Sequence, residues 1–248
     1  MRPTGLLLLS SLQSPLLAGP ALAQPADPPL PRALFDTMSA TLPRPFPGYR
    51  INHAKGVLYE GSFAPAPGAA ALTTAPHLQS APSTLLLRFS DAGGVPDVAD
   101  TAPSSAVRGL AFTFRLPDGT ETDLMCINVP VFVTKSPQDF LGLLRAGVAT
   151  KPGMPQPTPI AQFLDAHPES KRFVTLPKPV PESFATERFF ALHAYKVTNA
   201  AGESRFIRFR VVPEAGTAYR AADATAGRGF FVRNVSPRRF PLAQAEFL

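Results

Sequence analysis

The chain contains no tryptophan, one cysteine and, before Pro237, no block rich in lysine and arginine. The single cysteine, Cys126, excludes an internal disulfide framework and any metal site built from several cysteines. Its neighbours on a strand-like segment, Leu124 and Asn128, favour a buried structural thiol. The net charge of +6 comes from dispersed residues rather than one clustered face, so we expect no nucleic-acid partner.

The 30 prolines exclude a helix bundle, because a proline inside a helix breaks it. A length of 248 residues allows one sizeable hydrophobic core. We therefore expect one domain with appendages, built largely from strands.

The first 24 residues have the features of a secretory signal peptide. One basic residue precedes a leucine-rich run from Leu6, and Ala21-Leu22-Ala23 stands just before Gln24. Polar residues and Pro15 interrupt the run, which disfavours a membrane-spanning helix. We expect export, to the periplasm in a Gram-negative source, and no membrane association after cleavage.

Strand patterns dominate the remainder of the chain. Alternating or extended apolar residues occur in six segments, at 50–63, 84–90, 107–116, 121–128, 188–198 and 203–213. Two short turns containing glycine, at 117–120 and 199–202, join neighbouring segments into hairpins. Helical spacing of apolar residues predicts short helices at 31–40, from Pro137 onward and at 159–166.

These elements predict an α+β fold, a closed antiparallel β-barrel with short flanking helices. Residues 25–48 form the expected linker and N-terminal helix, and residues 49–217 the barrel domain. Residues 218–248 have no clear period, so we expect a disordered tail.

Three polar residues are candidates for one pocket. His53 lies three residues after Arg50, Ser90 two residues after Arg88, and Asn128 at the end of a strand-like segment. Taken singly, each has an ordinary structural interpretation: a packed histidine, a strand-end hydroxyl and an asparagine that starts a turn. A serine can, however, fix which imidazole nitrogen faces a substrate.

The order and spacing of eight short phrases resemble the catalase family over roughly residues 30–217, in particular its small periplasmic catalase-related peroxidases. The phrases are Arg50-x-x-His53-Ala-Lys-Gly, Leu87-Arg-Phe-Ser90, Gly94-Val-Pro-Asp-Val-Ala-Asp100, Arg108-Gly-Leu-Ala-Phe, Asp118-Gly119, Asp123-Leu124, Asn128-Val-Pro-Val-Phe132 and Arg205-Phe-Ile-Arg-Phe-Arg-Val-Val-Pro213.

The resemblance implies a catalase-like, haem-dependent barrel that holds haem b (iron protoporphyrin IX). His53 would move the peroxide proton as base and then acid, Ser90 would orient His53, and Asn128 would position the peroxide. Arg50 and Arg88 would pair with the haem propionates. Phe140 would contribute an apolar wall of the pocket.

The implied function is that of an exported haem peroxidase acting in the response to oxidative stress. It would reduce hydrogen peroxide or organic peroxides with a small organic electron donor, with weak catalase activity. Two alternatives stay open: a barrel that binds haem or a hydrophobic ligand without turnover, and an inactive fragment.

The family binds iron through a tyrosine within an Arg-x-x-x-Tyr phrase, where the arginine favours the phenolate. The chain has four tyrosines, none with an arginine four positions earlier: Tyr49, Tyr59, Tyr195 and Tyr219. We therefore predict no metal-ligating residue, and we do not expect His77, His167 or His193 to replace the tyrosine. The resemblance implies a C-terminally truncated or frameshifted member.

Overall fold

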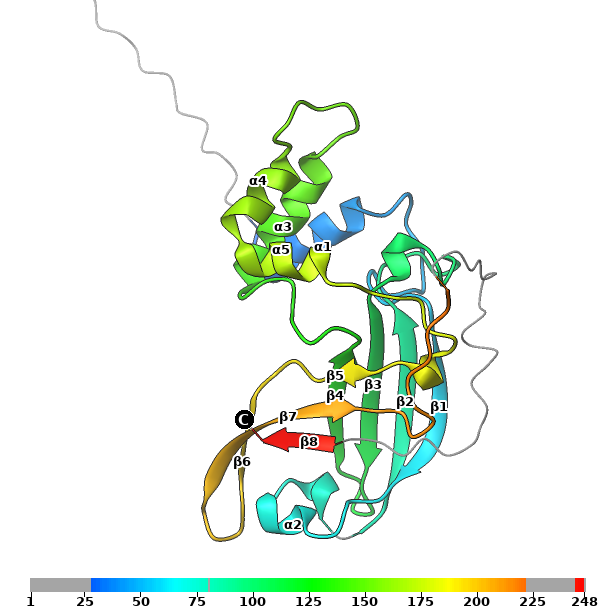
Figure 1. The fold of residues 1–248 in the computed structure, drawn as a ribbon, viewed down its shortest axis with the longest axis vertical. Coiled ribbons are helices and arrows are strands. Elements are labelled where there is room, and N and C mark those ends of the chain that lie inside the picture. The colour runs from blue at the N-terminus through cyan, green and yellow to red at the C-terminus, as the bar shows by residue number, and fades with distance from the viewer. Residues whose placement is uncertain (1–27, 80, 222–243, 248) are drawn as a thin grey trace, which may run out of the picture.

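The computed structural model describes residues 28–79, 81–221 and 244–247. An antiparallel sheet forms the lower part of the molecule and a group of helices the upper part (Figure 1). The predicted signal peptide and positions 222–243 of the predicted tail lie outside the described residues. None of the helices in the described part has the length and hydropathy needed to cross a membrane.

The eight-stranded sheet is antiparallel throughout, in the order β1-β2-β3-β4-β5-β7-β6, with β8 also paired to β7. The strands are β1 Gly56–Phe63, β2 Ser83–Asp91, β3 Arg108–Arg115, β4 Glu121–Ile127, β5 Phe189–Phe190, β6 Tyr195–Thr198, β7 Ser204–Val211 and β8 Gln244–Phe247. Both predicted hairpins are confirmed, as β3–β4 and β6–β7.

The predicted closed barrel is wrong for the described residues, because β1 and β6 stand at opposite ends of the strand order and do not pair. The link between the two halves of the sheet is the two-residue strand β5, which meets β4 at a single register pair, Ile127 with Phe190. So short a ladder lets the sheet bend rather than continue evenly. Strands β7 and β8 accordingly run across the direction of β1–β4 (Figure 1).

The hydrophobic core fills the space inside this bend. Period-two alternation sends Leu85, Leu87 and Phe89 of β2 to one face, and β3 does the same with Leu110, Phe112 and Phe114. Phe89 stacks on Phe184 with ring centroids 5.2 Å apart. Burying each such ring contributes roughly 1.5–3 kcal/mol.

Cys126 lies in this core, as predicted. Burial raises the pKa of its thiol to about 12, so the sulfur stays protonated at neutral pH.

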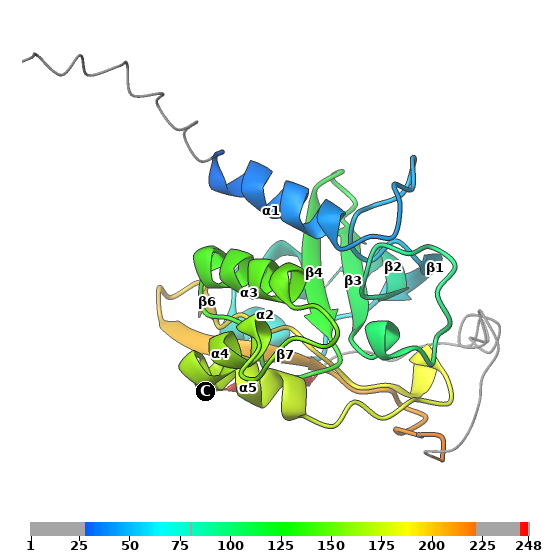
Figure 2. The ribbon, with the colours of Figure 1, turned by 90° about the horizontal axis from the view of Figure 1, so that it is seen from above.

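The helices are α1 Leu30–Ala40, α2 Ala69–Leu72, α3 Pro137–Ala149, α4 Pro159–Ala166 and α5 Pro168–Thr175, with short 3₁₀ helices at Pro76–Leu78, Pro103–Ser105 and Phe184–Thr186. The three predicted helices are confirmed as α1, α3 and α4, whereas α5 was not predicted. Seen from the helical end, α1 and α4 flank α3 (Figure 2). Ser136 caps α3 by accepting a hydrogen bond from the Asp139 amide at 3.0 Å.

Two sequence expectations need correction. The segment at 50–63 is extended only from Gly56, so residues 50–55 form a loop, because His53 has a positive φ that no strand accommodates. Gln244–Phe247 forms β8 against β7, although it belongs to the segment predicted to be disordered.

Candidate functional site

His53 stands in the loop before β1, with its ring against Ser90. The distance between His53 Nδ1 and Ser90 Oγ is 3.0 Å, within hydrogen-bond range. His53 has a φ of 53°. Among the residues that the structure describes, it is the one non-glycine residue with a positive φ. Such strained backbone persists only where its surroundings enforce it, and it concentrates at functional sites.

Hydrogen bonds on both sides hold this loop. Arg88 Nη2 donates to the carbonyl oxygen of His53 at 2.9 Å. The Ala54 amide donates to the Gly93 carbonyl at 3.0 Å, and the Gly93 amide donates to Asn52 Oδ1 at 2.8 Å. The guanidinium of Arg88 therefore fixes the carbonyl of His53. The backbone of Gly93 fixes the residues on either side, Asn52 and Ala54.

Two glycines leave room for the histidine and the arginine. In the sheet, Gly56 pairs with Ser90, and Ser90 pairs with Gly109. A Cβ on Gly109 would lie 2.9 Å from both His53 Cε1 and Ser90 Oγ, and one on Gly56 would lie 2.5 Å from Arg88 Nη2. The groups that pack against the backbone at these two glycines are therefore the imidazole of His53 and the guanidinium of Arg88.

The electrostatic surroundings keep His53 neutral. Burial lowers the pKa of its imidazole, and the positive charges of Arg88 and then Arg50 lower it further. The pKa of Arg88 is lowered too, by burial and by Arg50. A neutral imidazole with one nitrogen held by a hydroxyl is suited to accept a proton at the other.

Arg50 and Arg88 form a pair of like charges that remains unneutralised within the described part of the chain. Neither guanidinium forms an ion pair with a carboxylate there, although Arg88 is half-buried and Arg50 is close enough to depress its pKa. Two adjacent guanidinium groups fit a ligand that carries two carboxylates.

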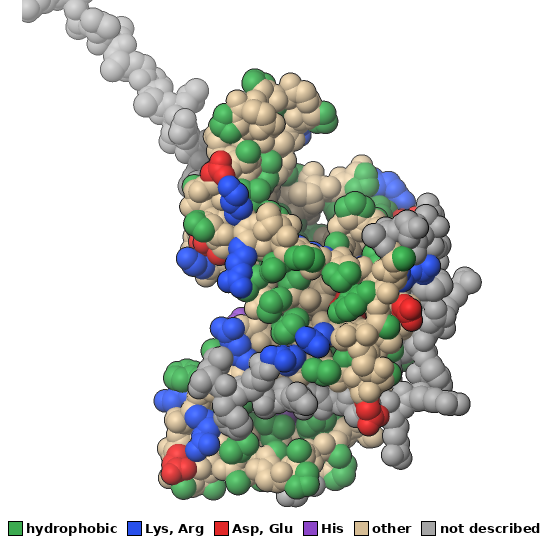
Figure 3. All heavy atoms as spheres, viewed as in Figure 1, with side chains coloured by type: hydrophobic (Ala, Val, Ile, Leu, Met, Phe, Trp, Pro, Cys, Tyr) green, Lys and Arg blue, Asp and Glu red, His purple; other side chains and the backbone are tan. Residues whose placement is uncertain are grey.

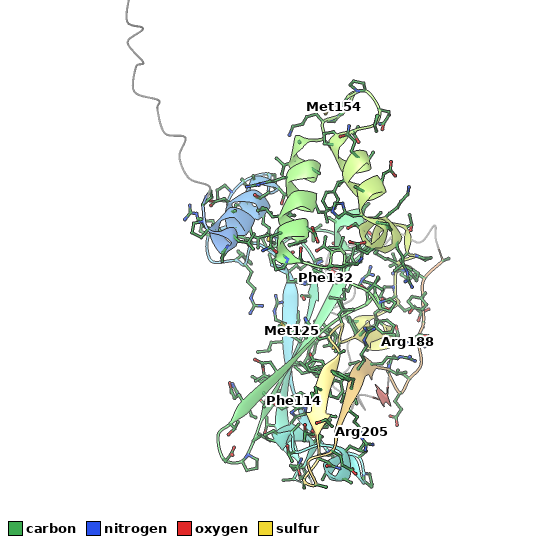
Figure 4. All side chains as sticks on the ribbon, turned by 90° about the vertical axis from the view of Figure 1, so that its left-hand side faces the viewer. Phe114, Met125, Phe132, Met154, Arg188 and Arg205 are labelled. Atoms are coloured by element: carbon green, nitrogen blue, oxygen red, sulfur yellow. The ribbon has the colours of Figure 1, made fainter. Side chains whose placement is uncertain are left out.

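An exposed apolar row lies on the same face of the sheet as Ser90 and Arg88. One register line joins Leu58 of β1, Arg88 of β2, Ala111 of β3 and Met125 of β4. Leu58 is 61% exposed and Met125 73% exposed, so two apolar side chains are open to solvent on either side of Arg88 and Ala111. Met125 projects from the side of β4 away from β7 (Figure 4).

Asn128 is not brought into contact with His53 or Ser90. Its Oδ1 accepts a hydrogen bond from the Arg108 amide at 2.9 Å, and its Nδ2 donates to the Ala106 carbonyl at 3.1 Å and lies 3.5 Å from Glu187 Oε2. The side chain thus closes the turn after β4. Its role toward peroxide stays a prediction.

Phe140, on the first turn of α3, is half-buried and packs against Phe132 with ring centroids 5.9 Å apart. Phe132 is exposed and lies where the strands meet the helical group (Figure 4). The two rings form an apolar patch, and the part of Phe140 in a pocket wall stays a prediction.

A buried charge cluster behind the His53–Ser90 pair was missed from the sequence. Lys55 contacts Asp100 and lies 3.7 Å from Asp91, and Arg108 lies 3.8 Å from Glu187. Burial, and then a hydrogen bond with Asp100, raises the pKa of Asp91 to about 7. Two features of the sequence could have revealed this cluster. Lys55, Asp100 and Arg108 belong to the phrases that carry the resemblance, and Asp91 directly follows Ser90.

Three of the tyrosines and two of the other histidines form contacts away from His53. Tyr59 and Tyr195 meet Phe89 and Phe209 edge-on, and Tyr219 donates to Glu187 at 3.0 Å. His77 stacks on a core ring, and His167 stacks on Phe163. Within the described residues no group of three or more His, Cys, Asp or Glu side chains is placed to hold a metal ion.

Basic side chains also gather away from this site. Figure 3 shows lysine and arginine side chains over the region of β7, the strand that carries the exposed Arg205 and Arg208.

Comparisons with known proteins find one matching family and one similar fold. The family described as catalase matches residues 43–229. A catalase-related peroxidase of Mycolicibacterium paratuberculosis is 37% identical over 73% of this chain and 58% of its own length, and one of Synechococcus elongatus is 33% identical over 68% and 50%. The chain thus spans about half the length of these curated relatives. A fungal catalase crystal structure has a TM-score of 0.59 and 22% identity, over 77% of this chain and 38% of its own, and shows a similar fold.

Proposed function

The chain belongs to the catalase family, and from that premise we propose that it is a haem-dependent peroxidase with His53 as its acid–base group. The observation that carries this proposal is the His53–Ser90 pair, 3.0 Å apart, beside two arginines that lack a carboxylate partner among the described residues. Two relatives named catalase-related peroxidase support the peroxidase assignment.

His53 would take a proton from peroxide at Nε2 and return it to the departing oxygen. Ser90 Oγ, as acceptor from Nδ1, would keep the Nε2 lone pair available. The lowered pKa of His53 keeps the imidazole neutral and ready to act as a base at neutral pH.

We infer that the residues of this face would accept a haem with two propionates, such as haem b. Arg50 and Arg88 would hold the two propionates, and the row Leu58, Ala111 and Met125 would lie against the macrocycle. When bound, haem b supplies the iron-centred redox chemistry that breaks the peroxide O–O bond. Phe140 would limit access to the pocket.

Asn128 would position the peroxide only after a local change. Its Nδ2 already donates to the Ala106 carbonyl and lies 3.5 Å from Glu187. The weaker of these contacts, that with Glu187, is the one a peroxide oxygen would replace.

The reducing partner, the compartment and the physiological role are also part of the proposal. We infer a small organic donor, export to the periplasm and a contribution to defence against oxidative stress, with weak catalase activity beside the peroxidase reaction.

Titration of the purified full chain with hemin, followed by peroxide-driven oxidation of a dye, tests the function. We expect a shifted and saturable Soret band and dye oxidation that depends on both peroxide and hemin. Saturable binding without oxidation would leave a haem-binding protein without turnover. Absence of binding would contradict the proposal.

A further inference from the structure

We propose that Lys55 is a positioning residue, which acts with the carboxyl groups of Asp91 and Asp100 to hold His53 in its left-handed backbone conformation with the ring against Ser90. The importance of this position for turnover rests on the proposed function, whereas the position itself is a property of the folded chain.

Lys55 fastens the histidine loop to a second loop that follows β2. Its Nζ donates to the Val98 carbonyl at 2.8 Å and contacts the Asp100 carboxylate. Its own carbonyl accepts a hydrogen bond from the Asp91 amide at 3.1 Å. Backbone and side chain of one residue therefore tie the segment that contains His53 to both carboxyl-bearing residues.

Both carboxyl groups are almost fully buried, although burial disfavours the charged form of a carboxylate. Asp91 is 2% exposed and Asp100 is 0% exposed. Replacing buried ion pairs by apolar residues of similar volume is often neutral or stabilising, so stability alone is a weak reason to bury these charges. Arg108 extends the cluster, since its Nη2 lies 3.4 Å from the Asp100 carbonyl.

The left-handed backbone conformation of His53 explains why the loop needs contacts such as those of Lys55. Two residues separate His53 from the first residue of β1, Gly56. A histidine released from its surroundings relaxes out of the left-handed region, since a side chain there is crowded by its own backbone. That relaxation would redirect the imidazole away from Ser90.

A histidine NMR titration of the haem-free full chain tests the proposal. The chain has four histidines, and the Cε1–H signal of His53 is assigned from its loss in His53→Ala. In the unsubstituted chain we expect His53 to titrate below the ordinary histidine range, because of burial and the two arginines. In Lys55→Met, a solvated ring should titrate at higher pH, and the signal should shift toward that of an exposed histidine.

Lys135→Met is the matched control, because the Lys135 side chain is 77% exposed and pairs with Glu169 at the surface. It should leave the His53 signal unchanged. If Lys55→Met does not fold, Asp100→Asn replaces the carboxylate with an isosteric amide and should move the His53 titration in the same direction.

A folded Lys55→Met or Asp100→Asn chain with a lowered Tm but an unchanged His53 titration would overturn the proposal and leave a purely structural cluster. Failure of both variants to fold would overturn it in the same way. Turnover with bound hemin is measured separately, and we expect it to fall about tenfold or more in a folded variant with hemin binding retained. An inactive parent chain would contradict the proposed function and leave the NMR result standing.

Discussion

Contacts to both the backbone carbonyl and the imidazole ring hold His53 in position. Arg88 holds its carbonyl at 2.9 Å, and Ser90 lies 3.0 Å from its Nδ1. Arg88 therefore orients the histidine and lowers its pKa at the same time. A single substitution at this arginine would change geometry and charge together, which makes the histidine itself the cleaner residue to test.

Replacement of His53 by alanine should lower peroxide turnover by about 10²- to 10⁴-fold, because the general acid–base group is lost. Hemin affinity should change little, since the arginines and the apolar row remain. Steady-state dye oxidation and a Soret titration measure the two effects. His193→Ala, at an exposed position, is the control, and full turnover in the His53 variant would defeat the assignment.

Gly109→Ala should displace the imidazole without removing it. The added Cβ would lie 2.9 Å from His53 Cε1 and Ser90 Oγ, so ring or strand must move. We expect a loss of roughly 1–3 kcal/mol in the free energy of unfolding, as for other overpacked sites, together with reduced turnover. Denaturant unfolding measures the loss. Gly61→Ala, at a strand position with open space, should cost far less, and equal costs would rule out this crowding.

Among the elements, the sequence predicted best those whose pattern is local. The alternation along 84–90 and 107–116 corresponds to β2 and β3 within one or two residues. The loop at 50–55 looked extended because its left-handed histidine depends on contacts with Arg88 and Gly93, which lie far away in sequence. The open sheet was not predicted for a similar reason. The single register pair between β4 and β5 joins segments far apart in sequence, and a periodic pattern does not reveal it.

Helix α3 offers a test at this scale, because it carries Phe140. Ser136→Ala removes the hydroxyl that accepts from the Asp139 amide and should cost about 1 kcal/mol. In a protein of this size we expect a Tm lower by about 2–4 °C, which thermal unfolding followed by circular dichroism measures. Ser104→Ala, at an exposed serine, is the control, and an unchanged Tm in the Ser136 variant would show that the cap contributes nothing.

At the scale of the whole molecule, stability depends on groups whose protonation changes on folding. Folding lowers the pKa of His53, so its contribution to stability is lost as the pH falls below the ordinary histidine value of 6.5. Folding raises the pKa of Asp91, so its contribution is greatest in acid and is lost as the pH rises through about 7. The two effects oppose each other in mildly acidic solution.

Asp91→Asn isolates the second effect, because the His53 contribution cancels when the variant is compared with the parent. The free energy of unfolding of the parent relative to the variant should fall as the pH rises from 5 to about 7 and then level off. The groups that face Asp91 are Asp100, Lys55 and Arg108, and all remain in the variant. Urea unfolding at several pH values measures the trend, and a difference that does not vary with pH would contradict it.

Asp165→Asn serves as the control, since the side chain of Asp165 is 64% exposed.

The burial of Cys126 has a chemical consequence for a chain proposed to work in the presence of peroxide. Oxidation of cysteine begins with the thiolate, and a thiol with a pKa of about 12 inside the core offers almost none. Because the chain has one cysteine, no second thiol is available to form an intramolecular disulfide. The chain therefore carries its sulfhydryl in a form inert to the oxidant that we propose as its substrate.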